Sequence, residues 1–139
     1  MRAKLHQAFA VCATCVVSAT TAIEIIVRFL LIRPLIQAAF LSEEWAYLLT
    51  QRIASGRTTE DRKLLPKILE HHRIDITTVL LENGHELWET VVSKVYPKRN
   101  KIVHATDPAG SEEAQLAIEC AGRLRSGIAF LSQTGSGLP

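Results

Sequence analysis

Apolar residues recur every three or four positions along most of the chain, and this spacing is typical of one buried face of an α-helix. No stretch alternates apolar and polar residues over enough length to predict a β-strand. The predicted helices cover residues 3–33, 43–55 and 60–69, a short segment 76–81, an amphipathic segment 87–95, a helix that begins at Pro97, and a last helix at 112–131.

Capping and breaking residues set the predicted boundaries. Pro34 breaks or kinks the first helix, and Ser42 caps the next one. Asp75 caps the short helix, which Asn83-Gly84 closes. Pro66 is expected near the first turns of its helix, where a proline does least harm. These elements predict an all-α fold: a compact antiparallel bundle of four to six helices, forming a single domain over residues 1–139 with a disordered tail at 132–139.

The apolar composition of the chain indicates that it has a partner. The chain has 139 residues, enough to bury a core without disulfides or metal. Its hydrophobic fraction of 47% and mean hydropathy of +0.13 are at the apolar end for a soluble domain. We therefore expect part of the surface to be covered in a homodimer. The net charge of +2 is compatible with RNA but lacks the strongly basic stripe of a dedicated nucleic-acid binder.

The amino-terminal segment has two interpretations. Residues 1–6 are basic and residues 8–19 are small and apolar, which imitates a secretory signal. The apolar pattern continues further, however, and Glu24, Arg28 and Arg33 make it too charged for a membrane span. We expect a buried or amphipathic core helix and no membrane partner, with the signal segment as the alternative.

Three cysteines bear on metal and compartment. Cys12 and Cys15 have a Cys-x-x-Cys spacing, but Cys120 is distant and no second pair exists to complete a zinc site. Small buried thiols in a cytoplasmic protein are the expected interpretation. The chain also lacks a glycine-rich phosphate loop, a serine nucleophile elbow and a His-Glu-x-x-His motif, so no metal and no cofactor is expected.

The residues with the most chemistry lie close together between Arg99 and His104. Arginine offers a permanently charged planar fork that suits phosphate oxygens, and histidine exchanges protons near neutral pH. Asn100 follows the arginine directly and can orient either group or the phosphate. Three further cations surround the motif and are the predicted RNA-binding residues: Lys94, Lys98 and Lys101.

The geometry of a helix that begins at Pro97 both supports and limits this site. Arg99 and Asn100 would lie in its first turns, where unpaired N–H groups favour an anion. Asn100 and His104 are four residues apart and share a face. Arg99 and His104 are five apart, which separates them by roughly 140° on a regular helix. Either the arginine wraps around, or the helix start is irregular, or a second subunit completes the site.

Arg99, Asn100 and His104, following Pro97 in a helical chain, resemble the signature of the HEPN family. That family's motif is an arginine, usually a polar residue next, and a histidine four to six residues further on. The resemblance implies a dimer whose arginine–histidine pairs share one cleft, and a metal-independent endoribonuclease acting as a toxin or in phage defence. Toxins with a nucleotidyltransferase antitoxin carry tyrosine two places after the histidine; Thr106 stands here, which puts that antitoxin in doubt.

The function expected on this basis is cleavage of RNA, a hydrolase reaction in which the ribose 2′-hydroxyl attacks the adjacent phosphodiester. His104 would act as acid or base, and Arg99 would stabilise the phosphate. The alternative is a catalytically silent HEPN-like module that dimerises and binds RNA, a nucleotide or a protein such as an antitoxin or another regulator. A third possibility is a helical interaction domain in which the motif match is accidental.

Overall fold

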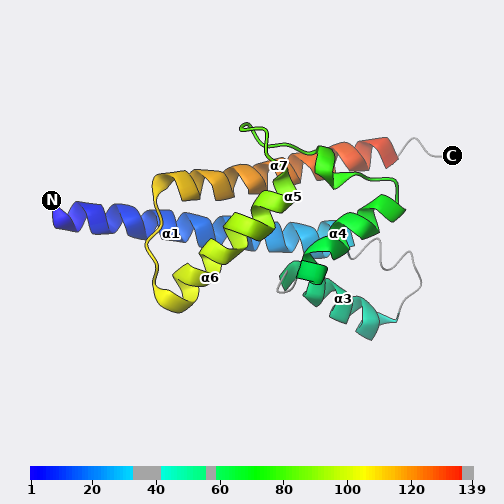
Figure 1. Cartoon of the computed structure of the whole chain (residues 1–139), viewed down its shortest axis with the longest axis horizontal. Coiled ribbons are helices and arrows are strands. Elements are labelled where there is room, and N and C mark those ends of the chain that lie inside the picture. Colours follow the sequence, from blue (N-terminus) through cyan, green and yellow to red (C-terminus); the bar gives the residue numbers. More distant parts are fainter. Residues whose placement is uncertain (33–41, 56–58, 136–139) are drawn as a thin grey trace.

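The computed structural model describes residues 1–32, 42–55 and 59–135, and over these ranges the chain is an all-α bundle, as predicted (Figure 1). The only sheet-like pairing in this part is an isolated antiparallel bridge between Leu80 and Glu86. The elements are α1 (Arg2–Ile25), the π-helix η1 (Ile26–Ile32), α3 (Glu43–Ser55), α4 (Thr59–His71), the 3₁₀ turn η2 (Ile76–Thr78), α5 (Leu87–Thr90), the π-helix η3 (Val91–Val95), α6 (Tyr96–Ala105) and α7 (Ser111–Gly135). The predictions made for Pro34 and for the tail at 136–139 lie outside the described residues.

The two longest helices, α1 and α7, lie side by side and run in the same direction (Figure 1). The continuous run of α5, η3 and α6 crosses this pair, with α5 and η3 against α7 and α6 against α1. Small side chains on both helices allow this close approach. The buried residues of the pair are Val16, Ala19, Thr20 and Ile23 on α1 and Ala114, Ala117, Cys120 and Leu124 on α7. The hydroxyl of Thr20 is satisfied within its own helix, since it donates to the carbonyl of Val16 at 2.7 Å. The core therefore forms around this pair, with α4, α5 and η3 adding Leu65, Leu69, Leu87 and Val91.

The first part of α1 projects beyond the end of α7 (Figure 1). Its side chains Leu5, Phe9 and Val11 are exposed. By length and composition the stretch Arg2–Leu30 is also the one helix among the described residues that could cross a membrane, and 28% of its apolar window is buried inside the protein. Core helices and signal sequences have the same length and composition. The packing against α7 gives the second half of α1 a place in the core.

The helix that carries the motif begins ten residues earlier than predicted. An unbroken helical run extends from Leu87 through η3 to Ala105, and Tyr96 has helical angles (φ −61°, ψ −47°) despite the following proline. The wide π-turn explains this, because the Tyr96 N–H bonds to the carbonyl of Val91, five residues back. A π-turn loosens the part of the helix where the ring of Pro97 would otherwise meet a carbonyl. Arg99 therefore does not lie at a helix N-terminus.

Other boundaries differ in smaller ways. Pro66 is the eighth residue of α4, inside the helix rather than near its first turns. Asp75 does cap a helix, accepting a 3.0 Å hydrogen bond from the Thr77 N–H, but that helix is a single 3₁₀ turn. The Ser42 side chain accepts a long 3.4 Å bond from the Trp45 N–H at the start of α3. At the other end, α7 continues through Gly135 and thus includes four residues predicted as disordered.

Candidate functional site

The position of α6 is fixed by the tyrosine at its first residue. Tyr96 is 4% exposed and its ring meets that of Trp88 edge-on, with centroids 6.3 Å apart. The Trp88 indole N–H in turn donates to the carbonyl of Arg62 at 2.9 Å, which joins this helical run to α4. Because the aromatic pair lies in the core, the rotation of α6 about its axis is set before the motif begins.

Arg99 faces the first helix. Its Nη2 donates to Oε1 of Glu24 at 2.5 Å, and the two side chains are 29% and 21% exposed. A charge-assisted contact of this kind, between partners that are mostly shielded from water, holds the guanidinium firmly. Arg99 is therefore an anchored cation. Glu24 uses one of its N–H donors, and the guanidinium has several others.

Asn100 and His104 lie on the exposed side of α6. Neither side chain has a hydrogen-bond or ion-pair partner among the described residues. The two are four residues apart on a regular α-helix and share a face. Arg99 is turned from His104 by roughly 140° on that helix, and no contact joins them within the described chain. Three ways of bringing Arg99 and His104 together were expected. The regular α-helix between them removes an irregular helix start, and the bond to Glu24 removes an arginine that wraps around the helix.

Of the three lysines predicted to bind RNA, Lys98 is committed elsewhere. Its Nζ contacts Asp107 Oδ2 at 2.6 Å and Glu113 Oε1 at 3.0 Å, and it also donates to the carbonyl of Pro108 at 2.7 Å. The hydrogen bond to Asp107, assisted by Glu113, raises the pKa of Lys98. This lysine ties α6 to the start of α7 and is not a free phosphate contact, whereas Lys94 and Lys101 are exposed.

Two further residues lie at the Arg99 site that the motif did not indicate. Arg28 follows Glu24 by four residues, and its Nε, like that of Arg99, is buried without a partner among the described residues. The hydroxyl of Tyr96 is buried and unpaired in the same way. Burial raises the pKa of Tyr96 most; the charge of Glu24 adds to this, while Arg99 and Arg28 act against it. Tyr96 and Arg99 are three residues apart on α6, Arg99 binds Glu24, and Arg28 follows Glu24 by about one helical turn. We call these four neighbouring residues the Arg28–Arg99 cluster.

The signal that could have found this cluster was present in the sequence. Glu24 and Arg28 interrupt an otherwise apolar helix, and a charged residue in such a helix needs a partner when the helix packs in a core. The sequence does not show where that partner comes from, because Glu24 and Arg99 are 75 residues apart.

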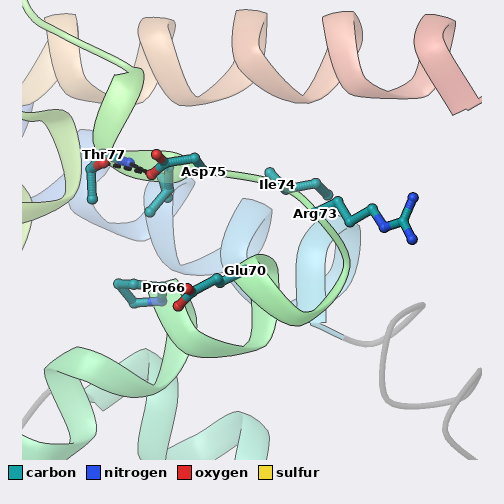
Figure 2. Close-up of a pocket in the computed structure, with 7 residues that line it drawn as sticks. Pro66, Glu70, Arg73, Ile74, Asp75 and Thr77 are labelled. Carbon is teal, nitrogen blue, oxygen red and sulfur yellow. Dashed lines mark hydrogen bonds between the residues drawn. The ribbon is translucent and has the colours of Figure 1, made fainter.

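A hollow of about 450 Å³ lies elsewhere, between the end of α4 and η2 (Figure 2). Pro66, Glu70 and Asp75 are among its lining residues, and Figure 2 shows the Arg73 side chain extending away from Glu70. The carboxylate of Asp75 is used locally, because Oδ1 accepts from both the N–H and the hydroxyl of Thr77. The hollow holds none of the residues expected for catalysis.

Candidate metal ligands and thiols were also located in the described part of the chain. No group of three His, Cys, Asp or Glu side chains there could hold a metal ion. All three cysteines are free: Cys12 and Cys15 are half-buried, and Cys120 is fully buried. Burial, and to a smaller degree the charge of Glu119, raises the pKa of Cys120 to about 12, so this thiol stays protonated and unreactive at neutral pH.

Comparison of the chain with family models, curated proteins and solved structures gives no match. The resemblance to the HEPN family thus depends on Arg99, Asn100 and His104 and their helical setting, and it stays a prediction. Function is therefore inferred from the arrangement of side chains on α1 and α6.

Proposed function

We propose that this chain is a metal-independent endoribonuclease of the HEPN type, whose site is completed when two copies pair along α6. The observation that carries the proposal is the exposed face of α6. Asn100 and His104 lie there together without a protein partner in the described part of the chain, next to the free cation Lys101. An imidazole left in water beside cations is available to a substrate, whereas a structural histidine is usually occupied by the fold.

The chemistry assigned to these residues is transfer within the RNA backbone. One imidazole takes the proton of the ribose 2′-hydroxyl, whose oxygen attacks the adjacent phosphorus, and the bond from phosphorus to the 5′-oxygen breaks. A second imidazole gives a proton to that leaving oxygen. The products are a 2′,3′-cyclic phosphate and a 5′-hydroxyl. Arg99 stabilises the charge on the phosphoryl oxygens, and Lys94 and Lys101 attract the backbone.

Pairing of two chains supplies what one chain lacks. A two-fold axis beside α6 brings the imidazole of one copy toward the guanidinium of the other and provides the second imidazole. Val103, next to His104, is 55% exposed, which leaves an apolar side chain for such a contact. DNA lacks the 2′-hydroxyl and is not a substrate for this reaction. A toxin or phage-defence enzyme in the cytoplasm, restrained by a regulatory protein, is the setting that this activity fits.

Purified protein incubated with single-stranded and structured RNA in EDTA should release fragments ending in cyclic phosphate. His104→Ala should lower the rate roughly a hundredfold to ten-thousandfold, because a positioned proton donor or acceptor is lost. His85→Ala is the matched control, since His85 is exposed in the turn before α5 and should be neutral. Equal cleavage by wild type and His104→Ala would refute the proposed activity.

One observation favours the second candidate, a silent module that dimerises and binds RNA, a nucleotide or a protein. Arg99 is already paired with Glu24, so it needs no substrate to be stable. RNA binding that depends on Arg99, without any cleavage in the same assay, would identify this second function.

A further inference from the structure

Charge is unbalanced in the Arg28–Arg99 cluster. The cluster holds two guanidiniums and a single carboxylate, that of Glu24, and only Arg99 forms an ion pair with it. Arg28 has no ion-pair partner among the described residues, although it is half-buried. A partly dehydrated cation without a counter-ion is costly, so the cluster favours an additional anion.

The cluster also has more hydrogen-bond donors than acceptors. The Nε atoms of Arg28 and Arg99 and the hydroxyl of Tyr96 are all buried, and none has an acceptor among the described residues. Tyr96 is the most enclosed of them, since its side chain is 4% exposed. Buried donors in folded proteins nearly always have an acceptor, supplied by the protein, by water or by a ligand. Three unpaired donors in one place call for a ligand with several acceptor oxygens.

We propose that the Arg28–Arg99 cluster is a phosphate-binding site between α1, η1 and α6, in which Arg28 and Arg99 grip the phosphate oxygens and Glu24 competes for Arg99. A phosphate presents oxygens at the spacing of the guanidinium fork and has more of them than a carboxylate, so it can accept from both arginines at once. Both arginines retain partial exposure, so their outer N–H groups can meet a phosphate that arrives from solvent.

The inference that this phosphate belongs to RNA rests on the proposed function, but the site itself does not. The phosphate can be free inorganic phosphate or part of an RNA backbone, and both offer the same oxygens. In the second case Arg28 adds a contact from the first helix to the motif on α6, and the substrate extends across the crossing of these two helices.

Two nearly isosteric substitutions with opposite expected effects test the site. Arg28→Gln should weaken binding of inorganic phosphate roughly tenfold or more, because one charge-assisted contact is lost. Glu24→Gln should strengthen it several-fold, because the amide still accepts from Arg99 but no longer repels the anion. Titration calorimetry gives both affinities. Arg123→Gln, at an exposed position on α7, makes the same charge change as Arg28→Gln and should leave phosphate binding unchanged.

Thermal unfolding with and without phosphate shows whether each variant is folded. If Arg28→Gln does not fold, Arg28→Lys takes its place in the titration. Comparison with Arg123→Gln also removes the general stabilising effect of phosphate on proteins. The proposal is overturned if Arg28→Gln (or, in its place, Arg28→Lys) binds phosphate like Arg123→Gln, or if Glu24→Gln binds it more weakly than wild type.

A second titration, with a single-stranded RNA oligonucleotide at several salt concentrations, identifies the source of the phosphate. If RNA occupies the site, Arg28→Gln should reduce the salt slope of log K by about 0.7, the value for one lost contact to a single strand. Loss of phosphate binding without a change in this slope assigns the site to free phosphate. If the protein cleaves RNA but Arg28→Gln binds phosphate as the wild type does, only this inference is refuted. If the protein binds phosphate at the cluster but does not cleave RNA, only the proposed function is refuted.

Discussion

At the scale of single residues, Tyr96 combines a buried ring with an unpaired hydroxyl. Its ring is needed in the core against Trp88, but its hydroxyl has no partner there. An unsatisfied buried hydroxyl costs about 1–3 kcal/mol. Phenylalanine would make the same edge-on contact without that cost, so the hydroxyl indicates a role other than stability, as expected for a donor in the phosphate site.

Replacement of this hydroxyl should therefore increase stability. Tyr96→Phe should raise the free energy of unfolding by about 1 kcal/mol at neutral pH. The pKa of Tyr96 is raised in the folded state, so above the unfolded pKa near 10 the unfolded chain releases a proton that the folded chain keeps. Wild-type stability should then fall by up to ~1.4 kcal/mol per pH unit from this residue, and Tyr96→Phe should remove that part.

Urea unfolding between pH 7 and pH 11 measures both effects. Tyr47→Phe is the control, because Tyr47 is 62% exposed on α3 and should not alter the pH slope. A destabilised Tyr96→Phe would show that the hydroxyl has a partner in solution.

At this scale the sequence predicts which functional groups are present, but not which neighbours they contact. The types and order of Arg99, Asn100 and His104 can be read directly, and so can their separation around a helix. The bond from Arg99 to Glu24 could not be predicted, because it depends on how two helices distant in sequence cross. The ion pairs of Lys98 could not be predicted for the same reason, since Asp107 and Glu113 reach it only once the loop after α6 has folded back.

At the scale of elements, Lys98 joins the motif helix to α7. Its two carboxylate partners are 37% and 44% exposed, so water weakens each pair, but together with the Pro108 carbonyl they surround one ammonium group. The Glu113 carboxylate also accepts from the Gly110 N–H at 2.8 Å, which closes the start of α7. The ammonium, the loop and the first turn of α7 thus form one connected unit.

Loss of this ammonium should loosen the unit. Lys98→Met keeps the aliphatic stem and should lower the free energy of unfolding by about 1 kcal/mol, an amount typical of a partly exposed ion pair. Lys94→Met, at an exposed position one turn earlier, should have no effect on urea unfolding. If Lys98→Met instead leaves stability unchanged and weakens RNA binding, the lysine is a phosphate contact after all.

Helix positions were largely predictable because apolar spacing and capping residues are local. The starts of α3 and α7 and the Asp75 cap follow from such local signals. The continuous run from Leu87 to Ala105 did not, because Pro97 is normally a start signal and the π-turn that accommodates it has no clear sequence mark.

At the scale of the whole molecule, apolar side chains remain uncovered on several sides of the described bundle. They lie on α1, η1, α3, α6 and α7 and include Phe9, Phe29, Trp45, Leu48, Val103 and Ile118. Exposed apolar surface of this extent commonly marks a contact with another molecule. Among these residues, Val103 is the one beside the motif, and it makes the proposed pairing along α6 testable.

A charge at this position should separate the two copies. Val103→Asp should weaken self-association at least a hundredfold, because an apolar contact is lost and a carboxylate must be dehydrated. Light scattering after size exclusion measures the mass, and the RNA assay should show cleavage lost with the dimer. Ile118→Asp, equally exposed at 53% on α7, is the control. A dimer that survives Val103→Asp with full activity would place the axis elsewhere.

The π-turn before the motif has a consequence for how such chains are compared. One extra residue in a helical turn rotates everything after it by about 100° around the axis. Two chains with the same arginine, asparagine and histidine can therefore point these side chains at different neighbours. The difference depends on whether the five residues before the helix, which lie outside the motif, form a π-turn. In this protein the π-turn Val91–Val95 comes directly before the helix from which Arg99 reaches Glu24.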